Sequence, residues 1–241
     1  MTGELERLAR RFQGHEPGLL GASRSYAVLC PLVEGEEGLR LLFEVRAPQL
    51  RQGGEVCFPG GKMEPGESVS DCALRETEEE LSIPRREITL LGAPDFICNQ
   101  RGFLLRPVLG TVSASGLAAM RPSPAEVAEV FTVPLSFFRE TAPEIRRYAL
   151  IPQVPEDFPY DAVGISRNYP WSQGQVEVPI WHYQGHVIWG MTARLVREIT
   201  RQSFLETPQG GPPSPLPDSG SHGRDKFTSG GDGAEISIPA R

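Results

Sequence analysis

The pattern of apolar and polar positions predicts a chain of strands interrupted by a few helices. Apolar runs at 26–32 and 39–46, joined by a turn of Gly and Glu residues, indicate a β-hairpin. Further strands are expected at 88–91, 103–112 and 176–183, an amphipathic helix at 5–12, and a closing helix at 187–204. This mixture predicts an α/β (α+β) fold, with a mixed β-sheet sandwiched between α-helices.

A further helix is expected from about Val69 to Leu81. Ser68 and Asp71 have the three-residue spacing of a helix start capped by a side chain. The helix should stop before Pro84, because the residue that precedes a proline disfavours the helical conformation.

Composition divides the chain into a folded part and a tail. From 207 to 241, 13 of 35 residues are Gly or Pro and the apolar residues are isolated, which predicts disorder. Residues 1–206 are then one domain, of a size that can bury a proper core.

Charge and cysteine usage narrow the class of protein. The formal net charge of −7 opposes broad binding to nucleic acid, and no apolar run has the length of a signal peptide or a membrane span. The four cysteines have no paired metal-ligand or disulfide spacing, which favours reduced, buried thiols. A cytoplasmic enzyme acting on a small molecule is the expectation.

Three carboxylates share one face of the predicted helix. At about 100° per residue, Glu79 and Glu80 fall on either side of Glu76, whereas Glu78 points the opposite way. Like charges this close favour a cation, and hard oxygen ligands suit Mg²⁺ or Mn²⁺. Taken alone, an acidic helix face is more often simply solvated.

The surrounding sequence resembles the Nudix box, G-x5-E-x7-R-E-U-x-E-E-x-G-U, in which U is a bulky apolar residue. The first glycine and the five charged positions match at the correct spacing: Gly61, Glu67, Arg75, Glu76, Glu79 and Glu80. Two positions depart from the pattern, since Thr77 replaces an apolar residue and Ser82 replaces the last glycine, which would enter a left-handed turn more cheaply.

The resemblance implies a Nudix fold and a metal-dependent hydrolase of diphosphate linkages. It implies that Glu76, Glu79 and Glu80 bind the metal with the carbonyl of Gly61, and that Arg75 and Glu67 pair to hold the loop against the helix. Glu79 or Glu80 could also orient or deprotonate the attacking water.

In several Nudix enzymes a further acidic residue from a later loop deprotonates the water. Glu126 and Glu129 lie in a comparable region, and a solvated loop glutamate is an equally good interpretation of each. Glu126 is included among the candidate catalytic residues.

The segment from Leu42 to Gly61, with its Gly-Glu-Val-x-Phe-Pro-Gly-Gly ending, is similar to the one that precedes the box in coenzyme A diphosphatases. That likeness predicts hydrolysis of coenzyme A, or its thioesters, to 3′,5′-ADP and the 4′-phosphopantetheine portion. Arg46 and Arg51 are candidate phosphate contacts, although each taken singly is more often a surface arginine.

Two functional alternatives stay open at this point. A Nudix hydrolase for ADP-ribose, NADH or another nucleoside diphosphate derivative would carry the same box, and a Nudix-like fold can also be a non-catalytic ligand sensor. His182 and His186 are four residues apart, but Gly185 between them breaks helical spacing and favours a structural role over a metal pair.

Overall fold

The computed structural model describes residues 3–15, 19–21 and 24–203. Its helices are α1 (Gly3–Phe12), α2 (Val69–Leu81), the 3₁₀ turn η1 (Arg85–Glu87), α3 (Ala114–Ala119), α4 (Leu135–Glu140) and α5 (Gly190–Ser203). The larger sheet contains β1 (Arg24–Gly35), β2 (Gly38–Arg46), β3 (Val56–Cys57), β4 (Gly60–Lys62), β5 (Ile88–Gly92), β6 (Ile97–Asn99), β7 (Phe103–Val112) and β8 (Val127–Pro134). A smaller sheet contains β9 (Glu144–Leu150), β10 (Gly174–Tyr183) and β11 (His186–Trp189).

The larger sheet is mixed and is ordered β3-β2-β1-β7-β5. Strand β1 runs parallel to β7 and antiparallel to β2 and β4, so the predicted hairpin of β1 and β2 is confirmed. Strands β6 and β8 extend the sheet by pairing with β7 and β2.

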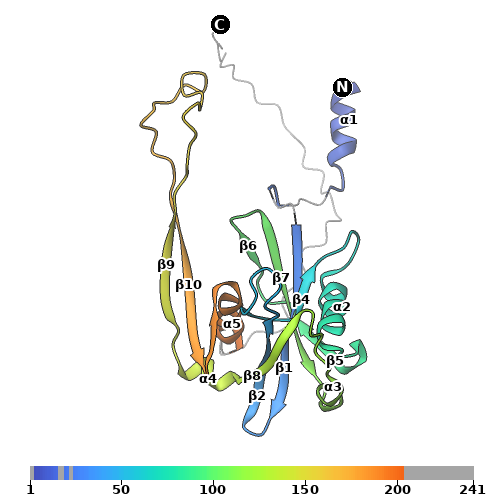
Figure 1. Cartoon of the computed structure of the whole chain (residues 1–241). Helices are drawn as coiled ribbons and strands as arrows, with labels where there is room; N and C mark the ends of the chain where they lie inside the picture. The colour runs from blue at the N-terminus through green and yellow to red at the C-terminus, as the bar shows by residue number, and fades with distance from the viewer. Residues whose placement is uncertain (1–2, 16–18, 22–23, 204–241) are drawn as a thin grey trace, which may run out of the picture. The chain divides into compact units, whose positions relative to one another are not determined.

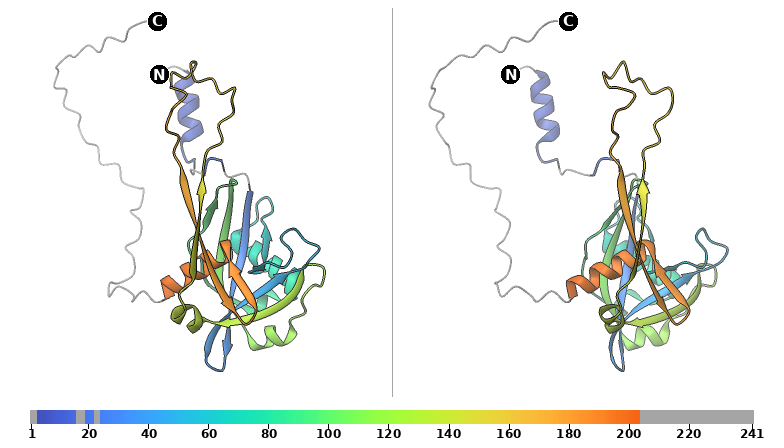
Figure 2. Two further views of the ribbon diagram at one scale, coloured as in Figure 1. Left: turned by 60° about the vertical axis from the view of Figure 1, so that its left-hand side comes forward. Right: turned by 90° about the vertical axis from the view of Figure 1, so that its left-hand side faces the viewer.

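Each face of this sheet packs against helices. Alternate residues of β1 enter two different cores: Val28 and Cys30 pack with side chains of α4 and α5, whereas Ala27 and Leu29 pack with side chains of α2. Helices α2 and α5 accordingly lie on opposite faces of the sheet in all three ribbon views (Figures 1 and 2). The predicted sheet between helical layers is confirmed.

The closing helix begins later than predicted. The apolar residues 187–189 belong to β11, which pairs with β10 across a turn in which Gln184 and Gly185 have positive φ. The helix therefore starts at Gly190, because a two-residue hairpin turn replaced the predicted junction of strand and helix. The predicted helix end at Phe204, the domain boundary at 206 and the tail at 207–241 lie outside the described residues.

The cysteine prediction holds in part. All four thiols are free, and Cys30 and Cys72 are buried. Cys98 is exposed on β6, which corrects the expectation of uniformly buried thiols. Of the helices that the structure describes, none combines the length and the apolar character needed to cross a membrane.

Candidate metal and substrate site

Helix α2 is fixed at both ends by side-chain capping. The Ser68 hydroxyl accepts a hydrogen bond from the backbone N–H of Asp71 at 3.0 Å, as the spacing predicted. At the other end Ser82 adopts the left-handed conformation, with φ 55°, and its backbone N–H donates to Glu78. The Ser82 hydroxyl also donates to the carbonyl of Arg121 at 2.9 Å, so this serine ends the helix where the family pattern has glycine.

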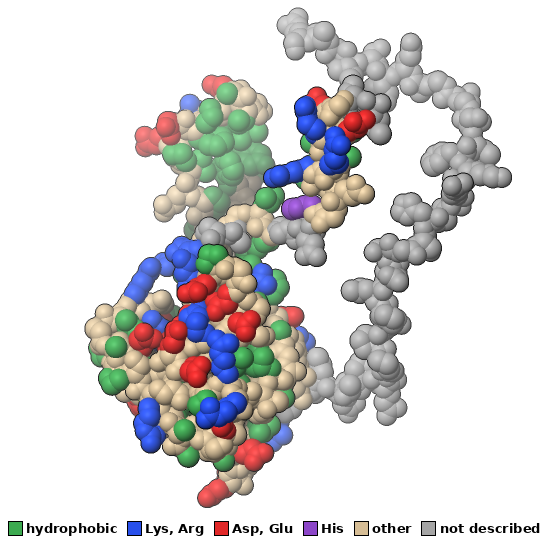
Figure 3. All heavy atoms as spheres, turned by 90° about the vertical axis from the view of Figure 1, so that its right-hand side faces the viewer, with side chains coloured by type: hydrophobic (Ala, Val, Ile, Leu, Met, Phe, Trp, Pro, Cys, Tyr) green, Lys and Arg blue, Asp and Glu red, His purple; other side chains and the backbone are tan. Residues whose placement is uncertain are grey.

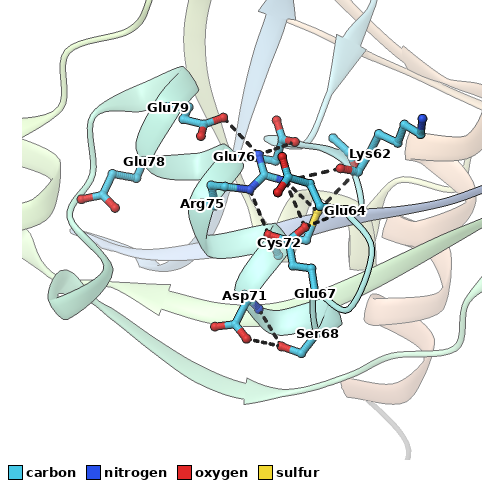
Figure 4. Close-up of polar contacts among 12 residues, drawn as sticks. Lys62, Glu64, Glu67, Ser68, Asp71, Cys72, Arg75, Glu76, Glu78 and Glu79 are labelled. Atoms are coloured by element: carbon cyan, nitrogen blue, oxygen red, sulfur yellow. Dashed lines mark hydrogen bonds and ion pairs between the residues drawn. The ribbon is translucent and has the colours of Figure 1, made fainter.

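One face of α2 packs in the core, and the other residues of the helix carry the charged side chains. Thr77 is fully buried and its hydroxyl donates to the carbonyl of Ala73, which satisfies the polar atom that replaces an apolar side chain. Glu78 points away from the other glutamates, toward Arg85 (Figure 4). The prediction that Glu78 lies outside the cluster agrees with this geometry.

Arg75 links the loop to the helix and holds two of the three predicted ligands. Its Nε lies 2.9 Å from Glu67, and its Nη1 lies 2.8 Å from Glu76 and 3.1 Å from Glu79 (Figure 4). The hydrogen bond from Arg75 lowers the pKa of Glu67 to about 2. The predicted pairing of Arg75 with Glu67 is therefore present.

The two glycines of β4 bring the helix carboxylates against the sheet. The Gly60 N–H donates to Glu80 Oε2 at 2.8 Å, and burial raises the pKa of that carboxyl group. The Glu76 carboxylate occupies the space where Gly61 lacks a side chain: a Cβ at Gly61 would lie 2.2 Å from Glu76 Cδ. Partial burial also raises the pKa of Glu76.

Glu44, in the middle of β2, is a site residue that we did not predict. It is 1% exposed, accepts a hydrogen bond from the Cys57 thiol at 3.2 Å, and interacts electrostatically with Glu80. The sequence does contain an indication of this role, because Glu44 is a single charged residue within an apolar strand. It lies on the same face of the strand as Leu42, which packs in the core beneath α2. A buried carboxylate on the helix-facing side of a strand belongs with the helix glutamates.

The carboxylate groups of the glutamates are not gathered around one point in this structure. Within the described ranges no three His, Cys, Asp or Glu side chains are arranged to hold a metal ion. Glu80 is 4% exposed and bound to Gly60, whereas the Glu79 side chain is 56% exposed and bound to Arg75. The face that carries α2 accordingly shows acidic and basic side chains side by side (Figure 3). The donor chemistry nevertheless suits a hard divalent cation, because carboxylates and the Gly61 carbonyl offer only oxygen.

The two candidate bases differ in position. Glu126 directly precedes β8. Burial chiefly raises the pKa values of Glu76, Glu80 and Glu44, and the negative charge of Glu126 adds to this, so Glu126 lies within electrostatic range of the glutamate cluster. Glu129 Oε1 instead lies 3.1 Å from Nε2 of His186, whose ring stacks on Phe131. This arrangement favours Glu126 over Glu129.

His182 and His186 lie in the hairpin of β10 and β11. His182 and Val187 are opposite one another in the β10–β11 ladder, and His186 stacks on Phe131 with ring centroids 3.7 Å apart. These contacts fit the predicted structural role.

A cleft of about 640 Å³ is lined by Gly60 and Gly61 together with residues of several strands and loops. That volume suits a nucleotide-sized ligand. The predicted contacts Arg46 and Arg51 both line it. Sequence reasoning missed two further arginines in the lining, Arg24 and Arg101, which lie far apart in the chain. Strands β1 and β7 bring them together, because Arg24 is opposite Phe103 in the ladder.

The charge of the cleft arginines is balanced only in part, because Arg46 interacts electrostatically with Glu44 and a single acidic residue, Glu55, lines the cleft. Among the described residues no carboxylate forms an ion pair with any of these four guanidinium groups, whereas the arginines elsewhere are often paired. The remaining lining includes the exposed aromatic side chains Tyr148 and Trp189. The cleft can therefore receive a ligand with several negative charges and a flat ring.

Comparison with known proteins places these features in a family. The NUDIX domain model matches residues 23–154. The uncharacterized Nudix hydrolase NudL of Photorhabdus laumondii is 32% identical over 181 residues, which cover 75% of this chain and 85% of that protein. The chain belongs to the Nudix hydrolase family. The NudL protein of Yersinia enterocolitica is 31% identical over 200 residues, covering 80% of this chain and 88% of its own.

Membership of the Nudix family fixes the class of reaction. The protein is a hydrolase that acts on diphosphate bonds, and Nudix hydrolases act on small molecules and generally use divalent metal ions. Among solved structures, RenU, a Nudix hydrolase from M. smegmatis, is 20% identical, covers 49% of this chain and 75% of its own, and has a TM-score of 0.42.

Proposed function

We propose that this Nudix hydrolase cleaves the diphosphate linkage of coenzyme A, releasing 3′,5′-ADP and 4′-phosphopantetheine, and that acyl derivatives are substrates too. The observation that carries the proposal is the set of four unpaired arginines beside Gly60 and Gly61. Coenzyme A has a third phosphate outside its diphosphate, and guanidinium groups bind phosphate through paired hydrogen bonds. The Leu42 to Gly61 segment, similar to that of coenzyme A diphosphatases, supports the same substrate.

Glu76, Glu79 and Glu80, with the Gly61 carbonyl, would hold Mg²⁺ or Mn²⁺. The fit is supported by the contacts of Glu80 with Gly60 and of Glu76 with Gly61, because both glycines also line the cleft. When bound, the cation supplies positive charge to the diphosphate oxygens and makes a water molecule more acidic.

The protein's own side chains bind the substrate and accept the proton. Arg46 and Arg51 bind phosphate oxygens along the cleft, and Arg75, held by Glu67, keeps Glu76 and Glu79 in place. Glu126, whose charge acts on Glu80, would receive the proton of the attacking water. Glu79 and Glu80 are the alternative groups for this step.

A second enzymatic candidate is hydrolysis of ADP-ribose or NADH, which share the adenosine diphosphate portion. The exposed aromatic side chains of Tyr148 and Trp189 could stack on an adenine in either case. A non-catalytic sensor is disfavoured, because a sensor has no need for a full set of metal-facing carboxylates.

The test compares hydrolysis of coenzyme A, dephospho-coenzyme A, ADP-ribose and NADH by the purified full chain with Mg²⁺ or Mn²⁺. We expect the highest kcat/KM for coenzyme A, and little turnover by Glu79→Gln or Glu80→Gln variants that retain the native circular dichroism spectrum. A preference for ADP-ribose would show that coenzyme A is not the main substrate. Unchanged turnover in both variants would refute the roles proposed for Glu79 and Glu80.

A further inference from the structure

Glu44 is held rigidly in the sheet. Its backbone pairs with Cys57 of β3 on one side and with Val130 of β8 on the other. The residue is 1% exposed and its neighbours Phe43 and Val45 point to the opposite face. The carboxylate therefore cannot turn outward to water.

One oxygen of this carboxylate has a partner and the other has none. Oε1 accepts a hydrogen bond from the Cys57 thiol, which burial keeps protonated by raising its pKa. Oε2 is fully covered and forms no hydrogen bond within the described residues. An unpaired buried oxygen of this kind costs free energy, which a bound ligand atom would offset.

The surroundings of Glu44 specify the charge of that ligand. Glu44 interacts electrostatically with three other carboxylates, those of Glu76, Glu80 and Glu126. Arg46 is the positively charged group that acts on Glu44. Ionised carboxylates gathered in this way repel one another, and either protonation or a multivalent cation among them relieves the repulsion. The cation must be small and bound by oxygen, because the free donors are carboxylate oxygens.

We propose that Glu44 binds the divalent cation through its free Oε2, so that the metal site draws on the sheet as well as on helix α2. In this arrangement Cys57 is a positioning residue, since its thiol holds Oε1 and thereby aims Oε2. The inference rests on the metal site proposed above. It differs from the alternative in which Glu44 is merely a buried neutral acid.

The first experiment measures Mn²⁺ affinity by isothermal titration calorimetry for the wild type, Glu44→Gln and the control Glu78→Gln. Gln is isosteric and removes only the charge, while Glu78 is exposed and faces Arg85. We expect Glu44→Gln to weaken Mn²⁺ binding about 10- to 100-fold and Glu78→Gln to leave it unchanged. The rise in melting temperature on adding Mn²⁺ should shrink in parallel.

The outcomes separate this inference from the proposed function. Wild-type affinity in a folded Glu44→Gln variant would overturn the role of Glu44 while leaving the hydrolase intact. Absence of Mn²⁺ binding by the wild type would instead remove the metal site as a whole.

A second measurement does not depend on any variant folding. In a crystal structure of the wild-type protein with Mn²⁺, located by anomalous scattering, we expect Glu44 Oε2 in the inner coordination sphere, at about 2.0–2.3 Å. A cation bound by the helix glutamates with Glu44 outside that sphere would contradict the proposal.

Discussion

At the scale of single residues, two adjacent glycines support the site in different ways. The three atoms nearest to a Cβ at Gly61 would all belong to the carboxylate end of Glu76, which is the far end of a flexible side chain. A Cβ at Gly60 would lie 2.3 Å from the Ala27 carbonyl and 2.6 Å from Val28 Cα, and Gly60 has φ +151°. Gly61 therefore leaves room for the side chain of Glu76, a proposed metal ligand, and Gly60 leaves room for the backbone of β1.

We therefore expect Gly61→Ala to fold but to lose function. The methyl group should displace Glu76 and lower both Mn²⁺ affinity and kcat/KM about 10- to 100-fold, with a metal-free melting temperature close to that of the wild type. Gly60→Ala is the comparison, and strain there should cost about 1–3 kcal/mol of unfolding free energy. Equal loss of stability in the two variants would contradict this division of roles.

At the scale of elements, helix α2 could be predicted to the residue, because capping, periodicity and the following proline all act locally. The boundary of α5 could not, because an apolar run fits a strand and a helix equally well until the turn at Gly185 is known. Glu44 and Arg24 were missed for a different reason. Their roles depend on which strands become neighbours, and a single sequence does not state that pairing.

The Glu67–Arg75 pair joins the loop before α2 to the helix, and its contribution should depend on pH. The pKa of Glu67 is lowered from 4.5 to about 2 in the folded protein, so the stabilisation is present above pH 4.5 and is lost as the pH falls toward 2. In urea unfolding, Glu67→Gln should be less stable than the wild type at pH 7, and the difference should narrow between pH 4.5 and 3. Glu64→Gln, an exposed neighbour with no ion pair in the described chain, is the control. A constant difference over this range would show that the pair does not stabilise the fold through charge.

At the scale of the whole molecule, the distribution of charge matters more than its sum. The chain carries a net charge of −7, yet one cleft gathers Arg24, Arg46, Arg51 and Arg101 next to the glutamate cluster. A polyanion is repelled by most of such a protein and attracted to this cleft. The cleft thus has basic groups for phosphates, and it shares Gly60 and Gly61 with the carboxylates proposed to bind a cation.

Arg24 and Arg101 are candidates for binding the phosphate that lies outside the diphosphate of coenzyme A. If they bind the phosphate that distinguishes coenzyme A from dephospho-coenzyme A, the double variant Arg24→Gln/Arg101→Gln should raise KM for coenzyme A about 10-fold or more, since a charged hydrogen bond contributes about 1.5–3 kcal/mol. KM for dephospho-coenzyme A should change much less, and kcat should stay near the wild-type value. Arg146→Gln removes an exposed arginine of β9 that pairs with Glu144 outside the cleft, and it should leave both substrates unaffected. An equal rise in KM for both substrates would mean that these arginines bind the shared diphosphate or adenosine, and the specificity for coenzyme A would then have to come from Arg46 and Arg51.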